Sequence, residues 1–480
     1  MACRRSVAPP FSVKPAMPPL DSALIDRFVS LVGEAHALRD ERREPYLREW
    51  RDLYVGQTPV VLRPGSVEEV SAILTLASET RTAIVPQGGN TGLVGGQIPS
   101  ADGSQIVLSL GRLDRVRTLD PRGNTMTLEA GVTLQRAQEA AEAADRLFPL
   151  SLASQGTCTI GGNIATNAGG TAVIAYGNTR DLVIGLEVVL ADGRIWNGLR
   201  SLRKDNTGYD LKNLFIGSEG TLGIVTAAVV KLFPRPTTVA TAFVAVETPA
   251  AALELMASCR TNGARILTFE LLPRIGIEFA TRHMAGTRDP LLDPSPWYVL
   301  VETEGDADTL AESLAMAIDS GQATDATVAA SIDQAKAFWR LREGLSESQR
   351  FEGGSIKHDI AVPVASVPAF LERAIAAVEA LVPGCRPVPF GHLGDGNIHF
   401  NVSQPIGGDK AAFLAGWSAM NAVVHGIVAD MNGSLSAEHG IGVAKRDLLP
   451  GVKSSVEMDM MRGVKHLFDP LGILNPGKVL

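Results

Sequence analysis

The stretch TAIVPQGGNTGLVGG, residues 82–96, decides the first part of the fold. Its apolar beginning has the pattern of a buried strand, and that strand runs directly into a loop rich in glycine. The preceding segment, 66–80, carries Ser66 and Glu69 at capping-box spacing and then shows a single apolar helix face. Because a further strand is predicted at 58–64, the chain here forms a β-α-β unit that ends in a glycine loop.

The same kinds of pattern extend the prediction along the chain. The expected strands are at 105–110, 125–130, 182–190 and 221–233, and the expected helices lie within 21–50 and at 133–144. The glycine-rich loops stop close to Pro234, after which strands and helices alternate without such loops. We therefore expect a domain boundary near Pro234, followed by a second domain with long helices at 331–467.

The composition is that of a soluble globular protein with two or three domains. The chain has 480 residues, of which 45% are hydrophobic and 20% are charged, and it contains no apolar run long enough for a membrane helix. Its net charge of −8 argues against nucleic-acid binding, because neutralising phosphates requires a basic face. An anionic small molecule would therefore need a local positive site.

The cysteines and the first residues bear on the location of the protein. Cys3, Cys158, Cys259 and Cys385 are far apart and form no Cys-x-x-Cys pair. This usage favours neither a thiolate metal site nor a disulfide framework, so we predict a reducing, cytoplasmic location. The first twenty residues are basic and rich in proline without an amphipathic stripe, which indicates a flexible tail. The alternative is a leader for the mitochondrial matrix.

Three glycine-rich stretches precede Pro234. They are PQGGNTGLVGG (86–96), GTCTIGGNIATNAGG (156–170) and GSEGTLGI (217–224). None contains the Gly-x-Gly-x-x-Gly of a dinucleotide fold or the lysine of a P-loop. They offer many backbone N–H groups with no side chain in the way, which suits a concave anion site. Each could be an ordinary tight turn, but three together favour a large phosphorylated cofactor.

The stretch GHLGDGNIHF, residues 391–400, places two histidines beside a predicted hairpin. Asp395-Gly396 is a strong signal for a two-residue turn, which would set His392 opposite His399. Directly opposed residues share a face of the sheet with Cβ atoms roughly 5 Å apart, a workable distance for two ligands of one ion. The alternative is a hairpin whose histidines have no joint role.

A third ligand is available in SAEHGIG, residues 436–442, where Glu438 and His439 are adjacent. Consecutive side chains cannot easily reach the same atom, so Glu438 is the predicted ligand and His439 is left for another role. Two imidazoles and one carboxylate with open coordination positions are typical of a catalytic zinc site. Taken alone, Glu438 could equally be a solvated surface acid.

Six stretches of the chain resemble, in the same order, motifs of the FAD-linked D-2-hydroxyacid dehydrogenases, which are flavoproteins of the vanillyl-alcohol-oxidase type. They are PQGGNTGLVGG, GGNIATNAGG, LRKDNTGYDLKNLFIGSEGTLGI, GHLGDGNIHFNV, SAEHGIG and GILNPGK. The resemblance runs from about residue 54 to the C-terminus. Within the family it is greatest to the enzymes that act on D-2-hydroxyglutarate.

The resemblance implies an α+β fold in which a two-subdomain FAD-binding domain is followed by an antiparallel-sheet substrate (cap) domain and a helical C-terminal region. The implied division is a flexible tail at 1–20, N-terminal helices at 21–53, the FAD-binding domain at 54–234, the cap domain with its metal site at 235–467, and a segment at 468–480 that returns to the flavin.

The resemblance also implies which residues contact FAD. They are Pro86, Gln87, Gly88, Gly89, Asn90, Thr91, Gly92, Gly156, Thr157, Gly161, Gly162, Asn163, Thr166, Asn167, Gly169, Glu219, Gly220, Gly223, Ile224 and Asn475. Relatives with covalent flavin carry a histidine where Asn90 follows the first glycine pair. An amide cannot form that bond, so a non-covalent FAD is expected.

For the metal, the resemblance assigns His392, His399 and Glu438 as ligands of Zn²⁺. A bound divalent ion favours ionisation of the substrate hydroxyl, and His439 would accept the proton as general base. A hydride would then pass from C2 of the substrate to flavin N5. The expected function is oxidation of (R)-2-hydroxyglutarate, or a similar D-2-hydroxy dicarboxylate, to the 2-oxoacid.

The residues implied in substrate binding are Arg342, Ser346, Lys357, Asn401 and His439. Arg342 and Ser346 are four apart, hence on one face of a helix, and Lys357 follows in an extended stretch. These three match the residues that hold the distal carboxylate, and Asn401 matches the residue that binds the carboxylate beside the reacting carbon. The chain departs from the family at Ser346, where threonine is usual, and at His358, where tyrosine is common. The change at His358 puts the preferred dicarboxylate in question.

Three alternatives remain open at this point. A relative that acts on D-lactate, glycolate or D-mandelate would share the cofactor and the metal but would not need Lys357. A zinc hydrolase would use the glycine loops only as structure, and a flavoprotein subunit that merely relays electrons would need no metal or base. The resemblance also implies reoxidation by a carrier such as an electron-transferring flavoprotein, and a homodimer is a further prediction.

Overall fold

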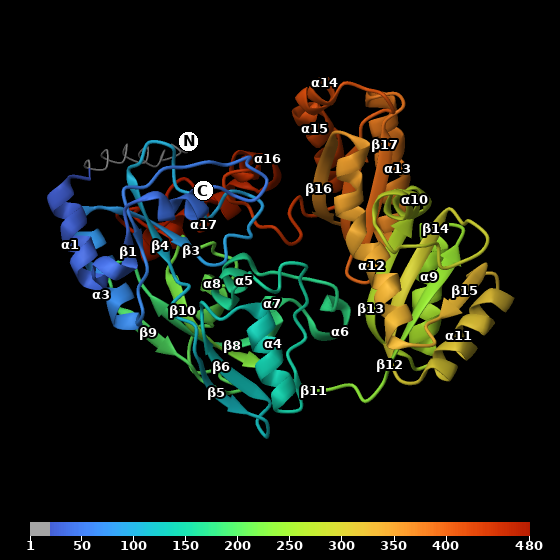
Figure 1. Cartoon of the computed structure of the whole chain (residues 1–480), viewed down its shortest axis with the longest axis horizontal. Coiled ribbons are helices and arrows are strands. Elements are labelled where there is room, and N and C mark those ends of the chain that lie inside the picture. Colours follow the sequence, from blue (N-terminus) through green and yellow to red (C-terminus); the bar gives the residue numbers. More distant parts are fainter. Residues whose placement is uncertain (1–19) are drawn as a thin grey trace, which may run out of the picture.

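The computed structural model describes residues 20–480, so the predicted flexible tail at 1–20 lies, apart from Leu20, outside the described residues. Figure 1 shows two bodies joined after strand β11. The first body holds the glycine-rich stretches together with the last helices of the chain. The second holds the elements from β12 to α15. The chain therefore leaves the first body once and returns to it at its C-terminal end.

The predicted β-α-β unit belongs to a four-stranded sheet of order β1-β2-β4-β3. Its strands are β1 (Ala37–Leu38), β2 (Val61–Leu62), β4 (Gln105–Ser109) and β3 (Ala83–Gln87). Strands β2 and β3 run parallel to β4, and α3 (Val67–Thr80) connects them, with α1 (Ser22–Val32) packed in the same core. The Ser66 side chain caps α3 by accepting from the Glu69 N–H. The Glu69 carboxylate accepts from Gly65 instead, so only half of the predicted capping box forms.

A second sheet of the first body is antiparallel, with order β5-β6-β10-β8-β9. Its strands are β5 (Val116–Asp120), β6 (Thr125–Glu129), β10 (Ile224–Lys231), β8 (Val183–Val189) and β9 (Ile195–Gly198). Helices α4 (Leu134–Ala143) and α5 (Ile160–Thr166) contribute apolar residues to its core. The strands and the helix expected here are confirmed with small differences at their ends, because their apolar periodicity coincides with the buried face.

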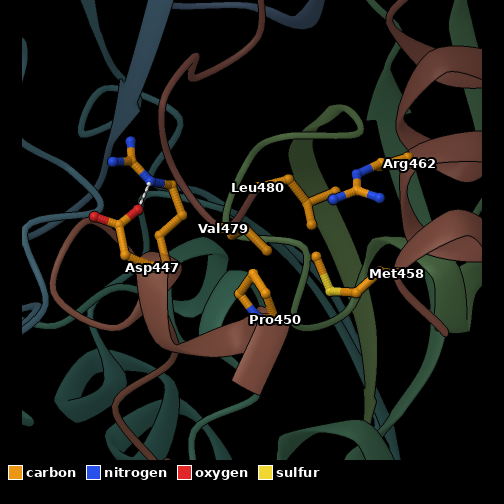
Figure 2. Close-up of a pocket in the computed structure, with 7 residues that line it drawn as sticks. Asp447, Pro450, Met458, Arg462, Val479 and Leu480 are labelled. Carbon is orange, nitrogen blue, oxygen red and sulfur yellow. Dashed lines mark hydrogen bonds and ion pairs between the residues drawn. The ribbon is translucent and has the colours of Figure 1, made fainter. Parts of the chain in front are cut away.

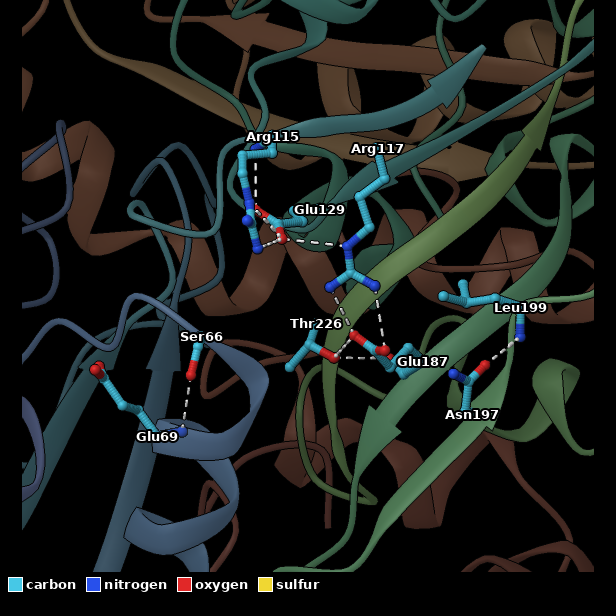
Figure 3. Close-up of polar contacts among 9 residues, drawn as sticks. All are labelled: Ser66, Glu69, Arg115, Arg117, Glu129, Glu187, Asn197, Leu199 and Thr226. Carbon is cyan, nitrogen blue, oxygen red and sulfur yellow. Dashed lines mark hydrogen bonds and ion pairs between the residues drawn. The ribbon is translucent and has the colours of Figure 1, made fainter. Parts of the chain in front are cut away.

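Charged side chains cross this second sheet on one face (Figure 3). Arg117 on β5 donates to Glu129 on β6 and, across β10, to Glu187 on β8. Arg115 also donates to Glu129, and the Thr226 hydroxyl donates to Glu187. Burial would raise the pKa of Glu129, but the two arginine side chains lower it overall. The network therefore gives two buried carboxylates a shared arginine partner within the sheet.

We expect Arg117→Met to destabilise the fold, because it removes the guanidinium shared by Glu129 and Glu187. Breaking a buried ion pair costs about 3–5 kcal/mol, and the lower end applies because 26% of the Arg117 side chain is exposed. A melting temperature lower by about 6 °C or more should result. Arg194→Met is the matched control, because its pair with Asp192 is exposed and such pairs contribute about 0–1 kcal/mol. Equal melting temperatures for the two variants would contradict the expectation.

The second body is built on a seven-stranded antiparallel sheet of order β15-β12-β14-β13-β17-β18-β16. Its strands are β15 (Asp325–Val328), β12 (Val239–Val246), β14 (Trp297–Glu304), β13 (Arg265–Pro273), β17 (Arg386–His392), β18 (Asn397–Ser403) and β16 (Ser355–Ala361). One face is covered by α9 (Pro249–Thr261), α11 (Ala307–Asp319), α13 (Val367–Leu381) and α15 (Trp417–Asp430). The other face is covered by α10 (Arg274–His283) and α12 (Ile332–Ser348). The antiparallel sheet expected after Pro234 is confirmed.

Shorter elements connect these layers. They are α2 (Glu44–Leu47), α6 (Val173–Tyr176), α7 (Thr179–Leu182), α8 (Lys212–Phe215), α14 (Lys410–Ala415), β7 (Arg146–Leu147) and β11 (Phe233–Pro234). The three cysteines within 20–480 are free and buried. In this part of the chain, every helix is too short or too polar to cross a membrane.

The C-terminal residues lie between the first sheet and helices α16 (Leu449–Val452) and α17 (Ser455–Phe468). Leu474 forms a parallel bridge with Ile84 of β3. The last residue, Leu480, helps to line a small cavity of about 160 Å³ between the two helices (Figure 2). The lining contains none of the predicted site residues, so this cavity is not the candidate active site.

Candidate active site

The histidine hairpin has a different register from the predicted one. His392 pairs with Asn397 and His399 pairs with Phe390, so the predicted pairing of the two histidines is wrong. The His392 carbonyl accepts from the Gly396 N–H at 3.1 Å and closes a four-residue turn, in which the Asp-Gly pair takes the last two positions. The shift moves the pairing by two residues, which preserves the face. The two imidazoles therefore still meet, with ring centres 5.4 Å apart.

One face of the seven-stranded sheet gathers most of the predicted site residues. Strand β16 pairs with β18 so that Lys357 lies opposite Asn401 and Asp359 lies opposite His399. Opposed residues of an antiparallel pair share a face, and His392 shares it as well. The register alone therefore brings the histidines of the hairpin together with Lys357 and Asn401.

His392, His399 and Glu438 form a group that could hold a metal ion. Each offers one ligand atom, and these atoms lie within 4.8 Å of one another. The His392 Nε2 atom is 3.6 Å from Glu438 Oε1. That oxygen also accepts a hydrogen bond from the Gly170 N–H, which fixes the carboxylate. Two imidazole nitrogens and one carboxylate are a donor set that zinc accepts, so the residues present fit the expected ion.

A second group, Asp359, Glu438 and His439, converges within the same distance. Asp359 is already engaged, because its carboxylate accepts from the Asn397 amide and from the N–H groups of Glu438 and His439. Burial alone would raise the pKa of Asp359, but the positive charges of His439 and Lys445 outweigh burial and hold it well below its usual value. Asp359 therefore anchors the Glu438-His439 pair and is not needed as a ligand.

The expected base, His439, stands beside the metal group. Its Nδ1 atom lies 3.3 Å from Asp359 Oδ2, and its ring lies parallel to that of His399 with centres 6.4 Å apart. Of its side chain, 31% is exposed. Because the Asp359 carboxylate faces Nδ1, the opposite nitrogen, Nε2, is the one left to exchange a proton.

Glu270 on β13, which sequence reasoning did not single out, lies fully buried next to the metal group. Its Oε1 atom is 2.6 Å from His392 Nδ1, and its Oε2 atom accepts from Arg342 Nε at 2.6 Å. Burial opposes the charge on His392, but Glu270 outweighs burial and raises the pKa of His392 to about 9. Metal ligands are neutral imidazoles, so an ion bound here would displace a proton.

The loop at 437–444, which carries Glu438 and His439, is held by all three glycine-rich stretches. The Val94 carbonyl of the first stretch accepts from two N–H groups of the loop at 2.8 and 3.1 Å. Gly170 of the second donates to the loop's glutamate, and the Glu219 carboxylate of the third accepts from Ile441 and the residue after it. Burial raises the pKa of Glu219 in spite of these two N–H groups. The glycine loops and the metal group therefore form one site.

The first glycine loop has the properties of a phosphate cradle. From Gly89 to Gly96, no backbone N–H donates a hydrogen bond to another residue of the described chain. A Cβ atom at Gly89 would come within 1.8 Å of the Thr157 carbonyl oxygen, so the first loop can lie on the second only without a side chain there. Unpaired N–H groups in a concave loop suit an anion, so these loops fit the pyrophosphate of FAD.

The side chains of Gln87 and Asn90 turn away from this loop. Gln87 Nε2 donates to the carbonyls of Tyr46 and Gln97, and Asn90 Nδ2 donates to two carbonyls of the segment 45–48. These amide nitrogens hold the N-terminal segment over the loop, whereas Gln87 Oε1 is buried without a hydrogen-bond partner among the described residues. Asn475 Nδ2 donates to carbonyls of the first and third stretches, so the C-terminal segment returns to the same place.

The expected cofactor residues occupy four places. Pro86 and Gln87 end β3, and Gly88, Gly89, Asn90, Thr91 and Gly92 form the loop after it. Gly156 and Thr157 precede α5, which contains Gly161, Gly162, Asn163 and Thr166 and is followed by Asn167 and Gly169. Glu219 and Gly220 form a turn, Gly223 and Ile224 enter β10, and Asn475 lies in the C-terminal segment.

The other end of the site is basic. Arg342 and Ser346 lie on α12, as predicted, and Lys357 Nζ donates to the Ser346 carbonyl at 3.2 Å. Burial, together with the charges of Arg350 and Arg51, lowers the pKa of Lys357 to about 8. Lys357 is nevertheless exposed to solvent. This cluster is the local positive site that an anionic ligand requires.

The departure at His358 does not reach this basic end. Neighbouring residues of a strand face opposite sides, and His358 is buried on the side of α15. There its Nδ1 atom lies 2.7 Å from the Phe400 carbonyl, and its ring meets that of His425 edge-on. Burial lowers the pKa of His358 to about 4. The expectation that His358 alters the distal end of the pocket is therefore wrong.

Glu270 and Asp359 were missed from the sequence, although each left a signal. Glu270 is an acid in the middle of the apolar stretch ILTFELLP, and a buried carboxylate needs a partner. Asp359 is two residues from Lys357, so strand alternation already placed it on the same face. Arg51 left no comparable signal, because a distant segment of the chain brings it close enough to Lys357 to affect its charge.

Comparisons with known proteins cover both bodies. Residues 58–198 match the family described as "FAD binding domain", and residues 235–479 match "FAD linked oxidases, C-terminal domain". A probable mitochondrial D-2-hydroxyglutarate dehydrogenase of Oryza sativa subsp. indica is 39% identical over 97% of this chain and 83% of its own length. A D-2-hydroxyglutarate dehydrogenase of Xanthomonas citri pv. viticola is 37% identical over 94% of this chain and 96% of its own length.

A solved structure shows the same fold. p-Cresol methylhydroxylase with substrate bound superposes with a TM-score of 0.73 over 97% of this chain and 98% of its own, at 16% identity. This likeness confirms the predicted fold of the vanillyl-alcohol-oxidase type, and the two family matches confirm FAD as the cofactor. The chain therefore belongs to the FAD-linked D-2-hydroxyacid dehydrogenase family and is an FAD-dependent enzyme.

Proposed function

We propose that this enzyme oxidises (R)-2-hydroxyglutarate to the 2-oxoacid, with FAD as electron acceptor and a zinc ion at His392, His399 and Glu438. The observation that carries the proposal is a single sheet face with a possible metal group at one end and a basic cluster at the other. A 2-hydroxy dicarboxylate presents a hydroxyl for the first and a distal carboxylate for the second. The names of the two relatives support the same substrate.

The basic cluster would hold the carboxylate remote from the reacting carbon. Glu270 binds Arg342 at Nε, so the Nη atoms of Arg342 are left for a paired contact with a carboxylate. Ser346 and Lys357 add a hydroxyl and an ammonium group from the neighbouring helix and strand. Asn401 is 2% exposed and its side-chain amide makes no hydrogen bond to another residue within 20–480, so this amide can bind the nearer carboxylate.

His439 would take the proton of the substrate hydroxyl at Nε2. Asp359 holds the opposite ring nitrogen and stabilises the imidazolium that results. When bound, FAD supplies an acceptor for a hydride at N5, and zinc supplies a Lewis acid for the substrate oxygens. The Glu219 carboxylate accepts two hydrogen bonds from the loop that carries His439, and so holds this loop against the glycine loops.

Each of the three alternative functions leaves some residues of the site without a role. A monocarboxylate such as D-lactate would leave Arg342 and Lys357 without an anionic partner. A zinc hydrolase would have no use for FAD, although the chain belongs to an FAD-linked family. A subunit that only relays electrons would not need a histidine held by Asp359 beside a metal group.

We further propose that a protein carrier such as an electron-transferring flavoprotein reoxidises the flavin. Its supporting observation is the family resemblance alone, and mixing the reduced enzyme with purified carrier would test it. The cytoplasmic location, its mitochondrial alternative and the homodimer stay predictions. The relative from rice carries the word mitochondrial in its name, whereas the relative from Xanthomonas does not.

Anaerobic mixing of the purified protein with substrate tests the proposed function. We expect D-2-hydroxyglutarate to bleach the flavin, L-2-hydroxyglutarate to leave it oxidised, and D-lactate to act much more slowly. A chelator should slow the bleaching, and added zinc should restore it. Bleaching that is equally fast with the L enantiomer, or that ignores complete removal of metal, would count against the proposal.

A further inference from the structure

Glu270 makes two contacts that join parts of the site with different tasks. It lies on β13, its side chain is fully buried, and it pairs across the sheet with His392. One carboxylate oxygen binds His392 Nδ1 and the other binds Arg342 Nε, each at 2.6 Å. Hydrogen bonds of this length to a carboxylate are charge-assisted and strongly directional. Both oxygens are thus engaged by residues of the site rather than by the surrounding sheet.

The contact with His392 determines which nitrogen faces the metal group. With Nδ1 turned to Glu270, the Nε2 atom faces Glu438 Oε1 at 3.6 Å. A carboxylate behind a metal-binding histidine fixes both the ring orientation and the position of its proton. Glu270 is therefore the residue of β13 that holds the His392 imidazole in the orientation that presents Nε2 to an ion.

The contact with Arg342 determines where its guanidinium points. Glu270 takes Nε, and the Phe390 ring lies under the guanidinium carbon at 5.0 Å from the ring centre. The two Nη atoms make no hydrogen bond to any residue of the described chain, so they are presented to the basic end of the site. Phe390 is itself the strand partner of His399. Arg342 therefore contacts two neighbours of the metal group, namely Glu270, which binds His392, and Phe390, which pairs with His399.

We propose that Glu270 is a positioning residue that couples the metal site to the recognition of the distal carboxylate. This inference rests on the proposed function, because it assumes that zinc and a dicarboxylate bind at the two ends. The inference adds that the two ends of the site are not independent. The buried Glu270 carboxylate orients both His392 and Arg342, so a change at Glu270 must affect both metal binding and recognition of the distal carboxylate. A residue with a purely structural role would instead affect stability alone.

Glu270→Gln separates these possibilities while keeping the shape of the side chain. An amide has one acceptor oxygen and one NH₂ donor, so it can accept from only one of the two donors. If NH₂ faces His392, the ring must carry its proton on Nε2, which blocks the metal. If NH₂ faces Arg342, the Nε–H is repelled and the guanidinium moves. The partner left with the amide oxygen loses the negative charge of its acceptor, which weakens its hydrogen bond.

Two measurements are needed on the full-length protein. The first is the zinc affinity of metal-free protein, from competition with a chromophoric chelator and without any turnover. The second is the ratio of kcat/KM for D-2-hydroxyglutarate to that for D-lactate, measured with zinc in excess. In Glu270→Gln we expect zinc affinity to fall about 10–100-fold, the usual effect of losing such a supporting carboxylate. The substrate ratio should fall at least about threefold in the same variant.

Two further variants complete the test. Glu302→Gln is the matched control, because Glu302 lies on the same face of the adjacent strand β14 but binds Trp339 and Thr241 instead of site residues. Its zinc affinity and substrate ratio should stay within about twofold of the wild type. Glu270→Asp keeps the charge and should recover part of both losses.

The outcomes decide between the proposals. If Glu270→Gln leaves either zinc affinity or the substrate ratio unchanged, or lowers only the melting temperature, the coupling is overturned and the proposed function stands. If the wild-type protein binds no zinc, or prefers D-lactate, the proposed function fails and the coupling falls with it. Loss at both ends with recovery in Glu270→Asp supports the coupling.

Discussion

Replacing His439 by asparagine should lower the rate of flavin reduction by D-2-hydroxyglutarate by about 10²–10⁴-fold, the usual contribution of a general base. The backbone N–H groups of Glu438 and His439 still donate to Asp359 in this variant, so the loop should keep its place. What disappears is the proton acceptor at the position of Nε2. Rapid mixing under anaerobic conditions measures this step directly, apart from product release and reoxidation.

The same variant separates a base from a metal ligand. Metal content and zinc affinity should remain those of the wild type, because His392, His399 and Glu438 are untouched. His283→Asn is a matched control, since His283 is also held by a carboxylate, Glu352 at 2.7 Å, but lies outside the site. A His439→Asn enzyme that reduces its flavin within tenfold of the wild-type rate would show that the proton leaves by another route.

The sequence was sufficient for those parts of the site that depend on local pattern. Strand alternation correctly placed Asn401 on the face of His399, and helical spacing placed Arg342 beside Ser346. The predicted pairing of His392 with His399 was wrong, but the prediction that the two imidazoles meet is confirmed. The true register is displaced by two residues, and only a displacement by one would have sent them to opposite faces.

The parts that depend on distant segments could not be predicted in this way. Glu270 lies more than a hundred residues from His392, and only the pairing of β13 with β17 makes them neighbours. Arg51 acts on the charge of Lys357 from the N-terminal segment, where the neighbouring Trp50 ring lies 4.9 Å from the guanidinium carbon of Arg350. Neither contact is visible in local periodicity or in a motif, because each results from how the two bodies and their sheets are packed.

Replacing Lys357 by methionine should lower kcat/KM for D-2-hydroxyglutarate by about 10–150-fold, because a hydrogen bond to a charged group contributes about 1.5–3 kcal/mol. D-Lactate has no distal carboxylate, so its kcat/KM should change by less than about twofold. Methionine keeps most of the length and apolar surface of the lysine, which limits effects on the fold. An equal loss for both substrates would mean that Lys357 supports the structure of the site and does not read the distal carboxylate.

The pH dependence provides an independent check on the same residue. Burial and the charges of Arg350 and Arg51 lower the pKa of Lys357 to about 8, so its ammonium is charged below that pH and neutral above it. The ratio of kcat/KM for D-2-hydroxyglutarate to that for D-lactate should therefore fall as the pH rises through about 8, since kcat/KM reports ionisations of the free enzyme. Lys357→Arg keeps its charge at every accessible pH, and its ratio should stay level over the same range. A decline that persists in Lys357→Arg would assign the titration to another group.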